Sequence, residues 1–356
     1  MVKFSYMHLP AYPIEESIDL IKAADDLGYY AAYSVDETWW KDMWLLFAAA
    51  ARETKQIRFG PNVTHVILRD PAHIVQMLGT LDELSGGRAE AVISFGNQSL
   101  LPQHGVNVEG MKPLSRTIEA QEVMRALLDN GAVTHSGEQF TYNGLWTLSR
   151  PVQERLPIKL GAMGGPRSFR VAGERFDGMH HALGYTRKNY DYVMENVKAG
   201  ADKAGRDWRE LDLAAWVVWA CGEDSAAAKE TARIMVAFYL ASMPPSQLER
   251  HGLSQDDLKP ILDAFGAGDT QKALDLTSPE LGDMLSISGT PEECVAKLQE
   301  QILPTGINHI VAAVVDPYLV TAFTGRDIAD CPGTKEQLSL IHDRVMPALE
   351  GAAAPA

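Results

Sequence analysis

The chain has 356 residues, of which 46% are hydrophobic and 22% are charged, as in a folded globular protein. The formal net charge of -15 at pH 7 disfavours attraction to nucleic acid or to an anionic membrane. Cys221, Cys294 and Cys331 form no CxxC pair, and we see neither a signal peptide nor a long apolar span. We therefore expect a cytoplasmic protein with reduced thiols that acts on a small molecule.

Short apolar runs alternate with helical patterns along the whole chain. The expected strands are, in order, Val2–Leu9, Tyr29–Val35, Ile57–Thr64, Ala89–Phe95, Pro157–Met163, Asp177–Leu183, Leu211–Cys221 and Asn308–Val315. The expected helices are Ile14–Leu27, Met43–Arg52, one that begins at Pro71, Ser115–Asp129, Pro166–Arg175, Lys188–Ala204, Ser225–Ala241, Pro291–Leu303 and Lys335–Leu349. Such a long alternation is typical of one parallel α/β protein.

The alternation predicts an α/β fold, specifically a (β/α)8 TIM barrel with insertions after helix 4 and after strand 7. The first insertion, Ala132–Pro151, is expected to be a small β excursion with turns at Ser136-Gly137 and Asn143-Gly144. The second is mostly helical and covers about 224–285. We expect one domain over 1–350 and a disordered tail over 351–356. The first βα turn lacks GxGxxG, so a dinucleotide-binding Rossmann fold has no support.

In a barrel of this kind the active site lies at the carboxyl ends of the strands. Asp36 and Glu37 follow the second strand, beside Trp39 and Trp40. A carboxyl in an apolar pocket can act as an acid or base near neutral pH, and tryptophans shape a pocket for a flat or apolar substrate. The alternative interpretation is a solvated acidic turn that caps the next helix, with the tryptophans as core anchors.

A glycine-rich loop, Gly161–Arg167, connects the fifth expected strand to the next helix. Glycines let backbone N–H groups approach an anion, and the helix N-terminus adds a partial positive charge. The loop is therefore a candidate phosphate site in which Arg167 helps. The alternative is a plain tight turn.

The remaining candidates are histidines and amides near strand ends. His8, His65, His104, His180 and His181 lack a spacing typical of a metal site, so we predict no metal. His8 is a candidate for proton transfer, with a structural histidine as the alternative. Asn97 and Gln98 are able to hydrogen-bond a ring carbonyl or a substrate. Thr64 and His65 follow the third strand and are candidates to line a ring.

Several segments resemble the bacterial-luciferase-like superfamily. They are LIKAADDLGYYAAYSVDE at 20–37, the IRFGPNVT…RDPA…TLDELSGGRA run from Ile57, GVNVEGMKPLSRTIEA at 105–120, and PVQERLPIKLGAMGGPR…VAGERFDG. In the C-terminal third, ARIMVAFYLASMPPSQLERHGLS at 232–254 and SISGTPEECVAKL at 286–298 are similar to the deazaflavin-using branch, closest to methylenetetrahydromethanopterin reductase. The resemblance covers nearly the whole chain, and MPPSQLERHG is its most specific marker.

The resemblance implies a barrel that binds coenzyme F-420, an 8-hydroxy-5-deazaflavin, at the strand ends and passes a hydride to or from carbon. It also implies a cis peptide bond at Asn62-Val63, behind the coenzyme ring. Met7 and Asn97 stand where the resemblance predicts acids, and Glu37 follows Asp36 where the family commonly has histidine. The residues expected to contact the coenzyme are Asn62, Val63, Thr64, Asn97, Ala162, Met163, Gly164, Gly165, Arg167 and His181.

The leading hypothesis is an F-420-dependent oxidoreductase with Glu37, Asp36 and His8 as catalytic residues and Trp39, Trp40 and Gln98 at the substrate. The first substrate to consider is a methylene-tetrahydromethanopterin or methylene-tetrahydrofolate type of C1 carrier. One alternative is an FMN-dependent luciferase-like monooxygenase, and another is a flavin- or deazaflavin-binding protein without turnover. A homodimer or higher homo-oligomer is expected from the resemblance alone.

Overall fold

Eight strands of this chain form a sheet whose pairing order closes on itself. They are β1 (Lys3–His8), β2 (Ala31–Ser34), β3 (Arg58–His65), β4 (Ala91–Ser94), β7 (Ile158–Ala162), β8 (Gly178–Ala182), β9 (Asp212–Cys221) and β11 (His309–Val314). Neighbours follow the order β1-β2-β3-β4-β7-β8-β9-β11, and β11 pairs in parallel with β1. The prediction of a (β/α)8 barrel is therefore confirmed by the computed structural model, which describes residues 2–97 and 100–350.

Contacts divide the chain into two compact units. The first, His8–Gly161, is called here the N-terminal unit, and the second combines the chain up to Met7 with the part from Ala162 onward and is called the C-terminal unit. Each unit is described by itself. The assignment of a single domain over 1–350 stays a prediction, and the expected tail at 351–356 lies outside the described residues.

The N-terminal unit has several helices that begin at residues that cap them or fit their first turn. Its elements are α1 (Ile14–Asp26), α2 (Met43–Ala51), α3 (Pro71–Ser85), a 3-10 turn (Leu101–His104) and α4 (Pro113–Asn130). Asp42 and Asp70 cap α2 and α3 through side-chain oxygens that accept backbone N–H groups, and Pro71 fits the first turn of α3. These caps fix where the chain leaves the carboxyl ends of β2 and β3, which is where the candidate residues lie.

A buried polar cluster lies among the strands of this unit. Glu90 accepts hydrogen bonds from Lys159 at 2.7 Å, from Arg58 at 2.9 Å and from the hydroxyl of Tyr33. The side chains of Glu90 and Lys159 are 0% and 1% exposed, so the two opposite charges compensate each other away from water. All four polar groups are thereby committed to holding β2, β3, β4 and β7 together.

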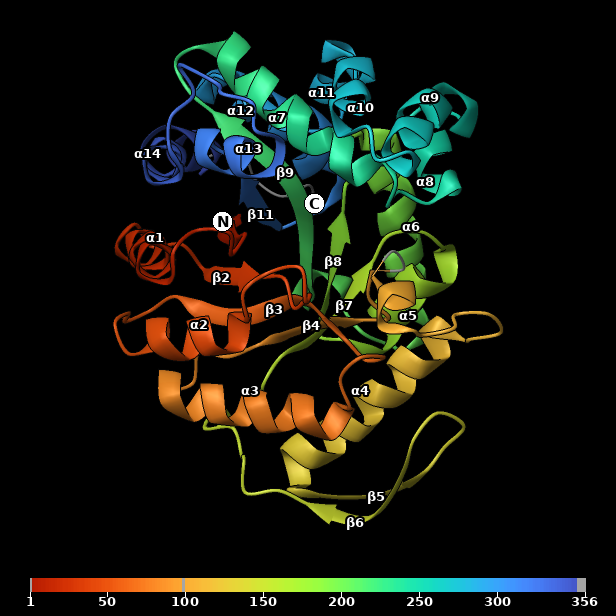
Figure 1. Ribbon diagram of the computed structural model, residues 1–356. Helices are drawn as coiled ribbons and strands as arrows, with labels where there is room; N and C mark the ends of the chain where they lie inside the picture. Colours follow the sequence, from red (N-terminus) through yellow and green to blue (C-terminus); the bar gives the residue numbers. More distant parts are fainter. Residues whose placement is uncertain (1, 98–99, 351–356) are drawn as a thin grey trace. The chain divides into compact units, whose positions relative to one another are not determined.

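The first insertion is an antiparallel hairpin of β5 (Ala132–Ser136) and β6 (Thr141–Trp146), which lies beside α4 (Figure 1). The turn predicted after Ser136 is confirmed. The turn predicted at Asn143-Gly144 is wrong, because both residues belong to β6. Gly144 has φ +66, and the pairing register shifts between Val133 and His135, so this glycine serves an irregularity inside the hairpin.

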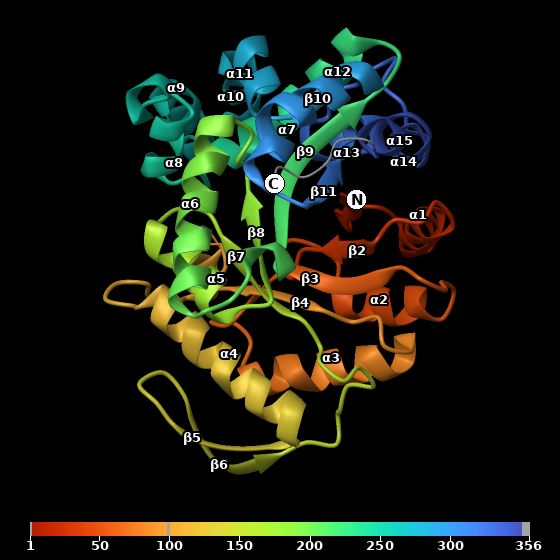
Figure 2. The same cartoon turned by 180° about the vertical axis from the view of Figure 1, so that it is seen from behind.

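In the C-terminal unit, α5 (Pro166–Arg175) and α6 (Arg187–Lys203) lie side by side (Figure 2). The expected helical insertion after strand 7 is confirmed as α7 (Ser225–Leu240), α8 (Pro245–Arg250), α9 (Gln255–Gly266), α10 (Thr270–Leu276) and α11 (Pro279–Met284). Gly173 and Gly200 allow the close approach of α5 and α6, because a Cβ on either would clash with the backbone of the other helix. This contact holds α5, and the loop before it, in place.

The C-terminal part also contains two elements that were not predicted, β10 (Ile287–Gly289) and α13 (Pro317–Thr324), beside three helical segments that match the predictions for Pro291–Leu303 and Lys335–Leu349. These segments are α12 (Pro291–Lys297), α14 (Thr334–Leu340) and α15 (Met346–Leu349). β10 and α13 were missed because three residues and eight residues are too short to show a clear period. Among the described residues, no helix is both long and apolar enough to cross a membrane.

Candidate functional site

Asp36 lies directly after β2 and Val35, and three side chains donate hydrogen bonds to its carboxylate. It accepts hydrogen bonds from Arg69 Nε at 2.7 Å, Arg69 Nη2 at 2.8 Å, Thr64 Oγ1 at 2.7 Å and Trp44 Nε1 at 3.1 Å. The guanidinium provides a bidentate, charge-assisted contact. Asp36 thus ties the end of β3 and the start of α2 to the end of β2.

Glu37 has different partners. Its carboxyl is hydrogen-bonded by the side chain of Asn97 and by Trp40 Nε1, which lies 3.3 Å from Oε2. Burial raises the pKa of Glu37 above its usual range, and the negative charge of Asp36 adds to this rise, while the two hydrogen bonds oppose it. A carboxyl held by neutral donors in this way is suited to carry and release a proton near neutral pH.

Both acids line a hollow of the N-terminal unit together with Trp40, His65 and His104. The side chain of His65 is buried, at 1% exposed, and neither of its ring nitrogens has a hydrogen-bond partner within the described part of the chain. Burial lowers the pKa of His65, so the ring is neutral. A buried imidazole without partners is costly unless a ligand supplies them, so His65 is a candidate to face a ligand.

The peptide bond between Asn62 and Val63 is cis, as the resemblance implied. The register between β3 and β4 shifts between Asn62 and Thr64, so the strand bulges here. The side-chain amide nitrogen of Asn62 is buried and has no hydrogen-bond partner among the described residues. The bulge therefore presents a donor and an irregular backbone at the carboxyl end of β3.

His8 is the last residue of β1 and is 0% exposed. Burial, assisted by the charge of Lys41, lowers the pKa of His8 to about 3. The ring is therefore neutral at pH 7, and its centroid lies 5.9 Å from that of Tyr12 in a stacked arrangement. A neutral ring packed in this way is a weaker candidate for proton donation than Glu37.

The predicted substrate residues differ in position. Trp39 is 48% exposed and donates from Nε1 to Gln103 at 2.9 Å, whereas Trp40 is half-buried and contacts Glu37. Trp44, considered with them, is buried in α2 and serves Asp36. Gln98 lies outside the described residues.

The C-terminal unit holds the rest of the predicted coenzyme residues. Gly165 precedes α5 as its N-cap, Gly165 and Arg167 are exposed, and a Cβ on Gly165 would meet no atom within 4 Å. His181 on β8 bonds the carbonyl of Ala162 through Nδ1 at 2.9 Å. The structure thus brings Ala162, His181 and the glycine loop together, with open space before the α5 N-terminus, where an anion is favoured.

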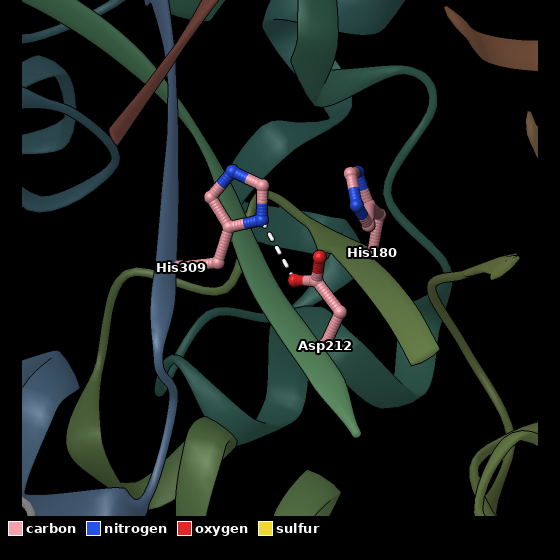
Figure 3. A group of neighbouring side chains, drawn as sticks. All are labelled: His180, Asp212 and His309. Carbon is pink, nitrogen blue, oxygen red and sulfur yellow. Dashed lines mark hydrogen bonds and ion pairs between the residues drawn. The ribbon is translucent and has the colours of Figure 1, made fainter. Parts of the chain in front are cut away.

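A separate buried cluster in the C-terminal unit has a composition compatible with a metal. Figure 3 shows His180, Asp212 and His309, whose potential ligand atoms lie within 4.8 Å of one another. His309 donates from Nδ1 to Asp212 at 2.7 Å and accepts at Nε2 from Ser5 at 2.7 Å, and Lys3 lies 3.2 Å from Asp212. Because Lys3 compensates the carboxylate and His309 uses both nitrogens, we interpret the cluster as a hydrogen-bonded tie between β1, β9 and β11.

The chain is similar to known proteins over nearly its full length. A sequence profile described as luciferase-like monooxygenase matches residues 2–309. The 5,10-methylenetetrahydromethanopterin reductase of Archaeoglobus fulgidus is 31% identical over 353 residues, which cover 98% of this chain and 100% of that protein.

Solved structures agree with the fold. The coenzyme F-420-dependent tetrahydromethanopterin reductase of Methanopyrus kandleri matches with a TM-score of 0.86 and 26% identity, covering 97% of this chain and 99% of the other. An F-420-dependent secondary alcohol dehydrogenase, solved with an F-420-acetone adduct, matches with a TM-score of 0.77 over 98% of this chain and 99% of the other. At 19% identity this second likeness concerns the fold alone.

Proposed function

Because the chain belongs to the luciferase-like monooxygenase family, we propose that it is a coenzyme F-420-dependent oxidoreductase. Its first candidate substrate is a C1 carrier of the methylene-tetrahydromethanopterin or methylene-tetrahydrofolate type. The observation that carries this proposal is the full-length similarity to a methylenetetrahydromethanopterin reductase, at 31% identity. The side chains at the strand ends support it independently.

The residues present fit a deazaflavin. In the N-terminal unit, the buried amide nitrogen of Asn62 and the ring nitrogens of His65 have no protein partner within the described residues, and an oxygen- and nitrogen-rich ring supplies such partners. In the C-terminal unit, the space beside Gly165 leaves room for an anionic tail. The proposal assigns the ring to Asn62, Val63, Thr64 and Asn97, and the phosphate to Ala162, Met163, Gly164, Gly165 and Arg167.

When bound, F-420 supplies the hydride exchange with a substrate carbon. Glu37 holds or accepts the proton that accompanies the hydride, at its carboxyl oxygen, because its raised pKa keeps a protonated form available. Asp36 fixes the ends of β2 and β3 and thereby the direction of Glu37. Trp40 lines the hollow, and we assign it and the exposed Trp39 beside it to contact a flat substrate and exclude water from it.

The test begins with binding. The purified protein is titrated separately with oxidised F-420 and with FMN, and the change in absorbance or fluorescence of each compound is followed. Reduced F-420 is then mixed with methylene-tetrahydromethanopterin and with methylene-tetrahydrofolate, and reoxidation is recorded. We expect tight F-420 binding and substrate-dependent reoxidation.

The same titration separates the alternatives. Binding of FMN without binding of F-420 would replace the proposal with an FMN-dependent luciferase-like monooxygenase. Tight F-420 binding with no reoxidation by these or other carbonyl and imine compounds would favour a binding protein without turnover. If only a ketone derived from an alcohol reoxidises reduced F-420, then F-420 remains the proposed cofactor and the proposed substrate becomes a ketone.

A homo-oligomer is part of the proposal. Large apolar side chains are exposed close together in sequence at the end of the hairpin and just after it, at Trp146 (68%), Leu148 (85%) and Val152 (58%). An exposed apolar group of this kind is typical of an interaction surface. Light scattering is expected to give a mass above that of one chain, and Leu148→Glu is expected to lower it.

A further inference from the structure

The sequence marker MPPSQLERHG forms α8 and its flanking residues, and its hydrogen bonds attach this segment to β8. Gln247 Nε2 donates to the carbonyls of Ala182 at 2.9 Å and Leu183 at 2.7 Å. His251 Nε2 donates to Leu183 at 3.0 Å, and its Nδ1 lies 3.0 Å from the hydroxyl of Thr186. Helix α8 is therefore fastened to the end of β8, at the strand that carries His181.

From this position α8 touches the glycine loop directly. Ser246 Oγ and Arg250 Nη2 lie 3.3 Å and 3.4 Å from the carbonyl of Gly164, and a Cβ on Gly164 would come within 3.1 Å of Pro244. The N–H of Gly165 belongs to the same peptide unit as this carbonyl. In a trans peptide the C=O and N–H point in opposite directions, so holding the carbonyl directs the N–H away from α8.

A second connection runs through side chains whose donor directions are unambiguous. Arg250 only donates, so its Nε bonds the oxygen of the Asn189 amide, at 2.7 Å. The amide nitrogen of Asn189 then donates to His181 Nε2 at 2.8 Å. His181 must carry its proton on Nδ1, which donates to the carbonyl of Ala162 at 2.9 Å. The peptide between Ala162 and Met163 is thereby oriented as well.

These groups are well packed. Asn189 and His181 are both 0% exposed, the ring of His181 meets Phe169 edge to face at 5.4 Å, and the Arg250 guanidinium lies 4.6 Å over the ring of Tyr192. A chain of hydrogen bonds with fixed donors and no exposed member has one favourable arrangement.

We propose that Arg250, Asn189 and His181 are positioning residues that set the peptide planes of the glycine loop for the phosphate of the coenzyme. This rests on the proposed function, since it assumes that the ligand of the loop is F-420. His181 consequently acts through Ala162 rather than on the coenzyme itself. The α8 segment serves the anionic end of the coenzyme and leaves the recognition of the ring to other residues.

The experiment compares two ligands that share a ring. One is F-420, and the other is the same deazaflavin carrying only its ribityl chain, without phosphate. Dissociation constants are measured for wild type, Arg250→Gln and Asn189→Ala. Arg187→Gln is the matched control, because Arg187 begins α6, is 56% exposed in its side chain and pairs only with Asp191 among the described ion pairs.

Arg250→Gln and Asn189→Ala are each expected to weaken F-420 binding about tenfold, the effect of one lost oriented hydrogen bond. The affinity of each for phosphate-free deazaflavin is expected to change less than about twofold. The rate at saturating F-420 is expected to stay close to that of wild type, and Arg187→Gln to match wild type throughout. Arg250→Lys, which keeps one donor, is expected to recover part of the affinity.

Equal weakening for both ligands would overturn the inference, because it would indicate general disruption of the unit. Unchanged F-420 affinity in both variants would also overturn it. Should Asn189→Ala fail to fold, Arg250→Gln still tests the inference, because Arg250 is only partly buried. If wild type binds F-420 and the phosphate-free deazaflavin with equal affinity, the inference fails and the proposed function stands; if it binds neither, the proposed function fails with it.

Discussion

The Arg69 guanidinium donates two hydrogen bonds to Asp36, at 2.7 Å and 2.8 Å, whereas the adjacent carboxyl of Glu37 is bonded only by neutral donors among its described partners. Two neighbouring acids thus have environments that separate their roles. Asp36 is committed to a cation and to the strand ends, and Glu37 is left with a carboxyl that readily holds a proton. The chemistry of the hollow depends on this difference.

Glu37→Gln is the most direct test of that role. The amide preserves the shape and the contact with Trp40 but cannot exchange a proton, so we expect kcat to fall by about a hundredfold or more. The Kd for F-420 is expected to change less than about threefold. Stopped-flow turnover and an equilibrium titration measure the two quantities. The exposed residue Glu16, on α1 of the same unit, provides the control Glu16→Gln. Unchanged kcat would remove Glu37 from the mechanism.

The pH dependence follows from the raised pKa of Glu37. In the direction that consumes a proton, activity requires the protonated acid and therefore falls as pH rises through that pKa. Asn97 stabilises the charged form by donating to it, so Asn97→Leu is expected to raise the pKa further and to move the fall in kcat/KM to higher pH. A shift toward lower pH would contradict the assignment. Asn97→Asp, which places a second negative charge there, is expected to act in the same direction as Asn97→Leu.

Asp36→Asn should act on stability as well as on rate. The substitution leaves the Arg69 guanidinium without its bidentate partner and weakens the contacts of Thr64 and Trp44. Because Arg69 is 32% exposed, we expect a loss of about 2 kcal/mol in the free energy of unfolding, below the range for a fully buried pair. Urea unfolding measures it. Asp19→Asn, which breaks an exposed pair with Lys22, should cost less than about 0.5 kcal/mol; equal losses would show that Asp36 is an ordinary surface acid.

The sequence was informative about where polar residues meet, because strands of a barrel all end at one rim. Asp36, Glu37 and Asn97 were expected there from their place after β2 and β4, and Glu37 and Asn97 are in contact. The cis bond at Asn62-Val63 was expected from resemblance, since no local pattern marks a non-prolyl cis peptide.

The different roles of Asp36 and Glu37 could not be predicted in the same way. Asp36 is distinguished from Glu37 by Arg69, 33 positions further along the chain, and only a folded structure brings the two together. Arg250 and Asn189 were missed for the same reason, although MPPSQLERHG was noticed as a marker. The Asn143-Gly144 pair predicts a turn, but in the structure the pairing of β5 and β6 only shifts register there and then resumes, because strand pairing prevails over local turn preference.

His65→Leu tests whether this imidazole, which has no hydrogen-bond partner among the described residues, serves a ligand. Replacing a buried polar ring by an apolar side chain removes unsatisfied nitrogens, so the free energy of unfolding should stay equal or rise by about 1 kcal/mol. Ligand binding should suffer instead, with about a tenfold loss in kcat/KM or coenzyme affinity. Urea unfolding and steady-state assays are run on the same preparation. Loss of stability without loss of affinity would make His65 a structural residue.

The cluster of Asp212, His309 and Lys3 allows a test against the metal interpretation. Asp212→Ala leaves the donor at His309 Nδ1 buried without its acceptor and separates Lys3 from its counter-charge. We expect a loss of about 2 kcal/mol in the free energy of unfolding, and a smaller loss for Asp212→Asn, whose oxygen still accepts from His309. In wild type, a chelator should leave the urea midpoint unchanged, and added zinc should not raise it. A midpoint that falls with chelator and is restored by zinc would instead make His180, Asp212 and His309 ligands, because binding to the native state alone stabilises it.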